Sequence, residues 1–383
     1  MKNMVYIQSG GPTSVINTSL YGAIKEAKRH PDQIGHIYGS QHGVEGLIDD
    51  DLIDLGLEDD EQIELLLQTP GSILGTTRRK LPKDIHTPEY AAIIENIKKH
   101  NIGYVFINGG NDSMDTCNKL AKLVKELGID DVKVIGVPKT IDNDLACTDH
   151  SLGFPSAAKF VMNSVNAFAM DAGWLTASVD LLPEQTRPHL IYLPEMKFDL
   201  EQFLVDVQRI YKEKGFALVA ISEGLQFERD MTNVRVDGFG HAQLGGAAAE
   251  LCRIVENRLD LGTRAVEFSI VQRAFPACVS LVDRKEAIKT GEKAVQAALK
   301  GRTGKMIIFE RVSQNPYKIK YKLAPLSKVA NAVSHVKPEM IIDATRMSDS
   351  FKDYLRPLVQ GEVKLVYKDG IAPVSNFKRI KVK

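Results

Sequence analysis

The sequence predicts an α/β protein with two Rossmann-like lobes and mainly parallel sheets. Short apolar segments rich in β-branched residues alternate with amphipathic segments, which is the pattern of repeated strand–helix–strand units. Glycine-rich or polar sequences follow several of the apolar segments, as expected where the strands of a parallel sheet end. With 383 residues, the chain is long enough for two such lobes.

The first lobe is expected to span residues 1–150. Its apolar segments predict strands at residues 4–7, 35–38, 104–107 and 133–137. Its amphipathic segments predict helices at residues 14–29, 61–67, 88–99 and 113–127. This alternation predicts a parallel sheet covered by helices.

The same pattern continues after residue 150, so we expect a second lobe at residues 151–335. Its strands are predicted at residues 189–192, 217–221 and 305–308, and its helices at residues 200–214 and 245–259. Residues 336–383 are expected to form a C-terminal helix and tail that pack back on the lobes. We expect this helix to end near residues 355–358 and the basic last residues to be solvated.

The charge balance gives no reason to expect nucleic acid or a membrane as partner, because 49 Lys and Arg residues balance 49 Asp and Glu residues. The four cysteines lack paired spacing, which argues against a zinc site and favours a reducing compartment. No secretory or membrane-spanning apolar segment is evident. We therefore expect a cytoplasmic protein whose anion site, if present, is local.

The loop at residues 138–144, Pro-Lys-Thr-Ile-Asp-Asn-Asp, directly follows a predicted buried strand. A Lys that neutralises phosphate, beside a carboxylate that deprotonates a hydroxyl, is the minimum equipment for phosphoryl transfer. The loop therefore indicates a kinase-like enzyme.

Two further strands are followed by paired glycines, Gly10-Gly11 and Gly109-Gly110. Such turns let the backbone approach phosphate, and the helix that follows offers unpaired N–H groups. Residues 71–79 add two arginines on a glycine-containing loop, and the guanidinium fork matches two phosphate oxygens. Together these loops predict an anion site at one sheet edge.

In these stretches the chain resembles the ATP- and pyrophosphate-dependent phosphofructokinases. The resemblance covers nearly the whole chain and rests on residues 9–12, 74–78, 109–113, 138–144, 222–224, 263–264 and 272–273. It implies the phosphofructokinase-like fold and the phosphorylation of fructose 6-phosphate, a reversible step of glycolysis. It also implies a homodimer or homotetramer with shared active sites.

The resemblance also implies roles for single residues. Asp142 matches the base that takes the proton of the sugar's C1 hydroxyl, and Arg78 a guanidinium that stabilises the transferring group. Further matches are Gly11 at the donor phosphates, Thr140, Ile141 and Asp144 beside the base, Glu223 at the sugar hydroxyls, and Arg264 and Arg273 at the sugar's 6-phosphate.

Two positions predict the phosphoryl donor. ATP-using members resemble one another in having Gly where this chain has Asp112 and Lys139. A carboxylate at Asp112 would crowd and repel the α-phosphate of ATP, while Lys139 supplies positive charge to the phosphate that leaves pyrophosphate. The resemblance therefore implies pyrophosphate as donor, with ATP as the alternative.

Mg²⁺ is the implied cofactor, and Asn111 stands where many members have an Asp ligand. An amide oxygen can bind Mg²⁺ but neutralises no charge, so Asp112, Asp142 or the pyrophosphate oxygens must contribute more of the coordination.

The chain departs from its relatives before Ala172, where a core strand and a Met-Gly-Arg loop that grips the sugar phosphate are expected to be missing. Three explanations remain open: the natural protein contains a segment that this sequence lacks, a deletion has reduced activity, or Arg187 or Lys197 substitutes. A second function therefore stays open beside the enzyme, that of a catalytically impaired sugar-phosphate-binding paralogue.

Overall fold

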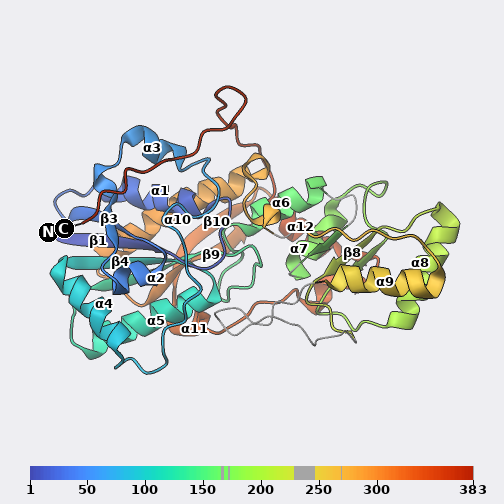
Figure 1. Cartoon of the computed structure of the whole chain (residues 1–383), viewed down its shortest axis with the longest axis horizontal. Helices are drawn as coiled ribbons and strands as arrows, with labels where there is room; N and C mark the ends of the chain where they lie inside the picture. Colours follow the sequence, from blue (N-terminus) through green and yellow to red (C-terminus); the bar gives the residue numbers. More distant parts are fainter. Residues whose placement is uncertain (165–167, 171–172, 228–245, 269, 383) are drawn as a thin grey trace.

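The structure is a computed structural model, and it describes residues 1–164, 168–170, 173–227, 246–268 and 270–382. Figure 1 shows two lobes side by side, with both chain ends on the larger lobe. The element order alternates strands and helices, and most strand pairs are parallel, so the predicted α/β class is confirmed. None of the helices in the described part of the chain is long and apolar enough to cross a membrane.

The larger lobe contains a sheet whose described strands run in the order β10-β9-β5-β4-β1-β2-β3. Five of them are parallel, and β3 and β10 run antiparallel at the two edges. The strands are β1 (Lys2–Gln8), β2 (Ile34–Ser40), β3 (Leu52–Asp54), β4 (Ile102–Gly109), β5 (Lys133–Pro138), β9 (Lys305–Ser313) and β10 (Lys318–Pro325). The four strands predicted in the first 150 residues are therefore confirmed.

Helices cover both faces of this sheet and bury two apolar clusters. One cluster includes residues of α2 (Val44–Ile48), α4 (Pro88–Lys99), α5 (Asn111–Glu126) and α11 (Leu326–Val329). The other includes residues of α1 (Ile16–Ala27), α3 (Asp60–Leu65) and α10 (Leu281–Leu299). The burial of apolar stripes on both faces of the sheet stabilises the lobe.

Helices α1 and α10 approach each other unusually closely, through two glycines. A Cβ atom on Gly22 would lie 2.0 Å from the carbonyl oxygen of Ile288, and one on Gly291 would lie 2.0 Å from that of Ser19. Any side chain at either position would force the helices apart. This contact fixes α10, although it is distant in sequence, to the first lobe.

The smaller lobe contains a parallel sheet of described strands in the order β6-β8-β7. Its strands are β6 (Phe168–Met170), β7 (Leu190–Tyr192) and β8 (Val219–Ser222), and its helices are α6 (Phe154–Ser164), α7 (Gly173–Ser178), α8 (Leu200–Lys214), α9 (Ala247–Leu259) and α12 (Asp349–Leu355). Helix α8 begins where Asp199 accepts hydrogen bonds from the N–H groups of Glu201 and Gln202, and ends at Gly215 with φ +80°. These are favourable caps at both ends.

The expected boundary of the second lobe at residues 151–335 needs correction. Strand β9 pairs with β5 in parallel, and β10 pairs with β9, so both belong to the first sheet. Strand pairing depends on hydrogen bonds to distant residues, which the local sequence pattern does not contain. The larger lobe therefore consists of two separate parts of the chain.

The C-terminal segment packs on both lobes. Residues 378–381 are exposed, as expected, but their main chain is held against the larger lobe. Phe377 is buried in the core of the larger lobe, and Val382 donates its N–H to the carbonyl of Leu52. Arg379 donates to the side chain of Gln41 and to the carbonyl of Ile73. The basic composition indicates exposed side chains, which the structure confirms, while main-chain pairing with the edge strand β3 holds the segment in place.

Candidate active site

Three loops of the larger lobe meet at one edge of its sheet. Gln8 at the end of β1 is in register with Asn108 of β4, and Asn108 is in register with Val137 of β5. Because the strands are parallel, the loops that follow them start side by side. This confirms that the two glycine turns and the loop at residues 138–144 share one edge.

The first turn is held against the loop that carries Arg78. Gly10 has φ +76°, a conformation that glycine adopts without strain, and its N–H donates to the carbonyl of Thr77 over 3.2 Å. The hydroxyl of Thr76 donates to the carbonyl of Gly10 over 2.7 Å. The two loops are therefore positioned together.

A buried polar network supports this pair of loops. The amide of Gln8 donates to the side chain of Asn17 over 2.9 Å. The oxygen of Gln8 accepts from the hydroxyl of Ser72 and the N–H of Leu74, and the oxygen of Asn17 accepts from the N–H of Ile73. Fully paired networks of this kind give the backbone one defined position. Gln8 and Asn17 were not predicted as site residues: Gln8 is a polar residue at the end of the apolar strand β1, whereas Asn17 lies in the first turn of α1.

Lys139 lies directly beneath the first glycine turn. Its side chain is buried, and its ammonium donates a hydrogen bond of 2.6 Å to the carbonyl of Gly11. Burial lowers the pKa of Lys139, and the net effect of its charged neighbours, Arg273 and Arg78 among them, leaves it at about 7. Asp142 and Asp144 act in the opposite direction. Basic side chains are therefore concentrated beside the turn at Gly10-Gly11.

Arg273 also reaches this turn, although it comes from the chain segment that follows the smaller lobe. A Cβ atom on Gly11 would lie 3.2 Å from Nη1 of Arg273, and the carbonyl of Arg273 accepts a hydrogen bond from Ser14 over 3.4 Å. The structure therefore groups Arg273 with Gly11 and Lys139. A side chain at position 11 would be in tight contact with this guanidinium, which would have to shift slightly.

Asp142 lies on the loop after β5 and is partly exposed. Its carboxylate accepts a hydrogen bond from the hydroxyl of Thr140 over 3.2 Å, and the same hydroxyl accepts from the N–H of Asp142 over 3.1 Å. Ile141 between them is fully buried and anchors the loop in the core of the smaller lobe. The arrangement holds a carboxylate at the surface of the loop beside a charged cluster.

Asp144 and Asn111 form a second polar pair at this edge. The amide of Asn111 donates to Oδ2 of Asp144 over 2.7 Å, while Oδ1 of each side chain is buried without a hydrogen-bond partner. Burial and the nearby negative charge of Asp142 raise the pKa of Asp144 to about 7. Two unsatisfied buried oxygens are costly unless a ligand completes them.

Asp112 occupies the first turn of α5, where negative charge is favourable. Its carboxylate forms a 3.3 Å ion pair with Lys80, and its side chain is 19% exposed. The ion pair with Lys80 offsets part of the negative charge of Asp112, but the carboxylate still occupies space at the start of α5.

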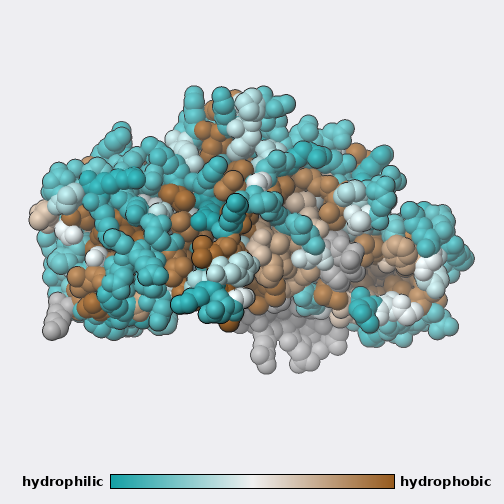
Figure 2. Space-filling model, turned by 90° about the horizontal axis from the view of Figure 1, so that it is seen from above, coloured by the Kyte–Doolittle hydropathy of each residue, from teal (hydrophilic) through white to brown (hydrophobic). Residues whose placement is uncertain are grey.

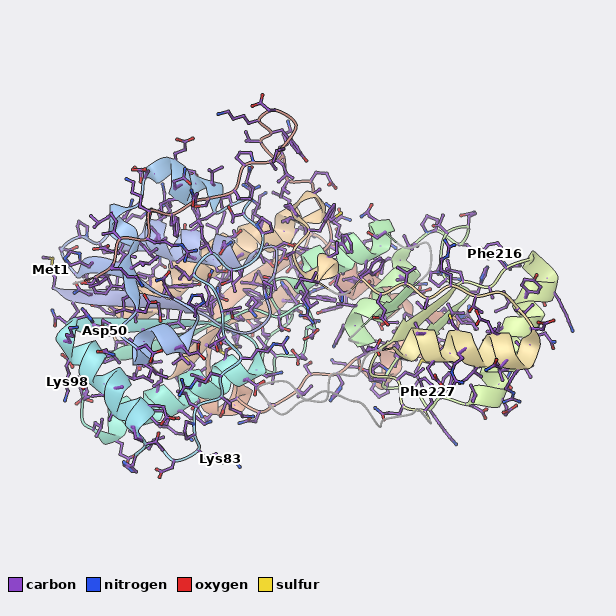
Figure 3. All side chains as sticks on the ribbon, in the orientation of Figure 1. Met1, Asp50, Lys83, Lys98, Phe216 and Phe227 are labelled. Carbon is purple, nitrogen blue, oxygen red and sulfur yellow. The ribbon has the colours of Figure 1, made fainter. Side chains whose placement is uncertain are left out.

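The residues matched to sugar binding do not all come together. Glu223 is buried at the end of β8, where its carboxylate accepts a hydrogen bond from the N–H of Ala247 at the start of α9. Arg264 is exposed and lines an apolar cavity of about 660 Å³ together with Phe216. Phe216 lies at the tip of the smaller lobe, far from the larger one (Figure 3). Arg273 is not among the residues that line this cavity.

The expectation that no strand precedes α7 is wrong. Residues Phe168–Met170 form β6, which pairs with β8 in parallel and completes one edge of the small sheet. The sequence contains no Met-Gly-Arg, and Ala172 lies outside the described residues. Arg187 is engaged in a 2.7 Å ion pair with the buried Asp180.

Comparison with known proteins identifies the class. The family model described as phosphofructokinase matches residues 3–298. The chain belongs to the phosphofructokinase family.

The names of individual relatives specify an activity within this family. A pyrophosphate–fructose 6-phosphate 1-phosphotransferase of Halomonas elongata is 36% identical over 410 residues, covering 99% of this chain and 97% of its own. One of Methylococcus capsulatus is 35% identical over 398 residues, covering 97% and 94%. The crystal structure of a pyrophosphate-dependent phosphofructokinase from Marinobacter aquaeolei superposes with a TM-score of 0.89 at 35% identity, covering 100% of this chain and 98% of that one.

Proposed function

We propose that this protein transfers a phosphoryl group from pyrophosphate to the C1 hydroxyl of fructose 6-phosphate. The products are fructose 1,6-bisphosphate and phosphate, and the reaction is reversible. Full-length similarity to proteins named for this activity supports the proposal. The observation that carries it is the buried ammonium of Lys139 at the carbonyl of Gly11, on an edge that also holds Asp142.

In the proposed mechanism, Asp142 accepts the proton of the C1 hydroxyl while that oxygen attacks phosphorus. The bond from phosphorus to the bridging oxygen of pyrophosphate breaks, and the leaving phosphate keeps the electron pair. Lys139 and Arg78 stabilise the charge that develops on it. Thr140 orients the carboxylate of Asp142 through its hydroxyl.

Gly11 and Lys139 are assigned to the donor phosphates, and the guanidinium of Arg273, which lies beside Gly11, to the sugar's 6-phosphate. The carboxylate of Asp112 would crowd the α-phosphate of ATP, so the site favours the smaller pyrophosphate over a nucleotide. Ile141 and Asp144 would line the sugar side of the same loop, and Glu223 and Arg264 remain proposed sugar contacts. Arg264 lines a cavity to which Arg273 does not contribute, so we propose that it reaches the sugar phosphate of a neighbouring subunit, in a homodimer or homotetramer with shared sites.

The residues present fit Mg²⁺ as the cofactor. Asn111 and Asp144 each have a buried, unpartnered Oδ1, and oxygen ligands are those that Mg²⁺ prefers. The described residues contain no group of three or more acidic, His or Cys side chains that could hold a metal. Pyrophosphate oxygens and water would therefore complete the coordination. When bound, the ion neutralises charge on the phosphoryl groups.

We further propose that the protein acts in the cytoplasm, because its four cysteines are all unpaired thiols. Production of fructose 1,6-bisphosphate from fructose 6-phosphate and pyrophosphate, followed with a coupled assay, tests the activity. A catalytically impaired sugar-phosphate-binding paralogue remains the second candidate, since the chain lacks Met-Gly-Arg. Binding of fructose 6-phosphate without any turnover would favour that paralogue.

A further inference from the structure

The loop that carries Asp142 is closed on itself by the next residue. Asn143 has φ +57°, a left-handed conformation that Asn tolerates better than most residues. Its side-chain oxygen accepts a hydrogen bond of 2.8 Å from the N–H of Ser151. At the start of the loop, the N–H of Thr140 donates to the carbonyl of Leu152. The position of Asp142 therefore depends on what holds Asn143.

The hydroxyl of Tyr354 on α12 contacts this loop at two residues, Asn143 and Asp149. The hydroxyl accepts a hydrogen bond of 2.8 Å from the amide of Asn143 and donates one of 2.9 Å to the carbonyl of Asp149. A tyrosine hydroxyl can do both at once. More than two hundred residues separate Tyr354 from the loop in sequence, so the contact is entirely a product of the fold.

The ring of Tyr354 is itself fixed on two sides. The guanidinium carbon of Arg311 on β9 lies 4.7 Å from the ring centre, and the ring of Trp174 on α7 lies 5.2 Å away. Phe351, on the same helix, stacks on Trp174 in the core of the smaller lobe. Figure 1 shows α12 close to α6 and α7, where the two lobes join. Figure 2, which shows the molecule from above, has apolar residues gathered near the middle of that face.

We propose that Tyr354 is a positioning residue that couples the packing of the smaller lobe to the placement of Asp142, acting through Asn143. The sugar is expected to contact the smaller lobe, whereas the base lies on a loop of the larger one. Tyr354 touches that loop and packs on the smaller-lobe core, so it can transmit a change in one to the other. The kinetic part of this inference rests on the proposed function.

Tyr354→Phe is the direct test, because it removes the hydroxyl and keeps the ring. Tyr317→Phe is a matched control: the Tyr317 ring lies 5.0 Å from the same guanidinium of Arg311, and its hydroxyl donates to Glu286 over 2.9 Å. Loss of one hydrogen bond that aligns the base should lower kcat about tenfold in Tyr354→Phe, with both KM values within about twofold. Tyr317→Phe should change kcat less than about twofold. Equal losses in the two variants would overturn the proposal.

A double-variant cycle tests whether the effect passes through Asn143. Asn143→Gly removes the amide and keeps a residue that tolerates φ +57°. In that background, Tyr354→Phe should lower kcat less than about twofold further, because the link is already broken. Independent, multiplying effects would show that Tyr354 does not act through Asn143.

Amide hydrogen exchange gives a readout that does not need turnover. Peptides spanning residues 140–153 should exchange about fivefold faster or more in Tyr354→Phe than in Tyr317→Phe, because the loop loses its brace. Equal exchange would contradict the proposal. If the unaltered protein shows no turnover with pyrophosphate, the proposed function fails, and the exchange result alone decides the role of Tyr354.

Discussion

The ammonium of Lys139 and the carbonyl of Gly11 are joined by a 2.6 Å hydrogen bond that links the loops after two parallel strands of the larger sheet. Residue 139 follows β5 and residue 11 follows β1, with β4 between them in the sheet. The contact therefore crosses β4 at this edge of the sheet. Burial of Lys139 and the neighbouring guanidinium of Arg273 lower its pKa to about 7, so its charge should be sensitive to pH.

Activity should depend on the charge of Lys139. Burial, together with Arg273 among its neighbours, lowers its pKa to about 7. Lys139 is charged below this value and neutral above it, so kcat/KM for pyrophosphate should fall as pH rises through about 7. Lys139→Met should lower activity and flatten this alkaline limb. Pyrophosphate kinetics between pH 6 and 9 measure the activity and the alkaline limb of both proteins. If the limb is unchanged in Lys139→Met, another group is responsible for the loss of activity at high pH.

Asp142→Ser should lower kcat by about 10²–10⁴-fold while the KM for fructose 6-phosphate changes little, because proton abstraction contributes rate enhancements of this size. Steady-state kinetics with varied sugar measure the two parameters. Asp130→Ser, at an exposed carboxylate away from the site, serves as control and should behave as the parent. A loss confined to KM would mean that Asp142 binds the sugar without acting as base.

Donor choice should respond to Asp112 and Lys139 together. Lys139→Gly alone should not create an ATP-using enzyme, because Asp112 still crowds the α-phosphate. The double variant with Asp112→Gly should raise the ATP to pyrophosphate ratio of kcat/KM. Its control is Lys80→Met, which removes the ion pair of Asp112 without removing its bulk. A double variant that keeps the parental ratio would exclude these residues as donor determinants.

His150 predicts a pH dependence of stability. Burial lowers its pKa, but the carboxylates of Glu286 and Asp149, at 2.7 and 2.9 Å, outweigh this and raise it to about 9. Its unfolded value is about 6.5, so the folded state binds more protons between pH 6.5 and 9. This stabilisation is complete below pH 6.5 and is lost as pH rises through 9.

The free energy of unfolding should therefore decrease by about 3 kcal/mol across this window, relative to His150→Gln. Denaturant unfolding at several pH values measures the difference. His86→Gln, at an exposed histidine, is the control and should retain the parental slope. The same slope in His150→Gln as in the parent would contradict the assignment.

Elements with clear local patterns were predictable from sequence. Helix α4 was expected at residues 88–99 and spans Pro88–Lys99, because Pro stands at its start and an apolar stripe runs along it. Helix α10 was missed, since residues around it are buried on more than one side and the amphipathic signal is weak. Strand β10 was missed although lysines alternate with apolar residues at 318–323, a pattern that predicts a strand with one face exposed.

The site was predictable where motifs follow strands, and less so where distant segments meet. The loops with Gly11 and Lys139 could be placed on one edge because parallel strands end together. The approach of Arg273 to Gly11 and the contact of Tyr354 with Asn143 join residues more than two hundred positions apart. No local pattern carries such contacts, so the structure was needed to find them.

The most direct test of the proposed function compares two donors in one assay. With Mg²⁺ and fructose 6-phosphate, we expect kcat/KM for pyrophosphate to exceed that for ATP at least tenfold, a difference of about 1.4 kcal/mol in transition-state stabilisation. Formation of fructose 1,6-bisphosphate is followed in both cases. Comparable values for the two donors, or a preference for ATP, would contradict the account.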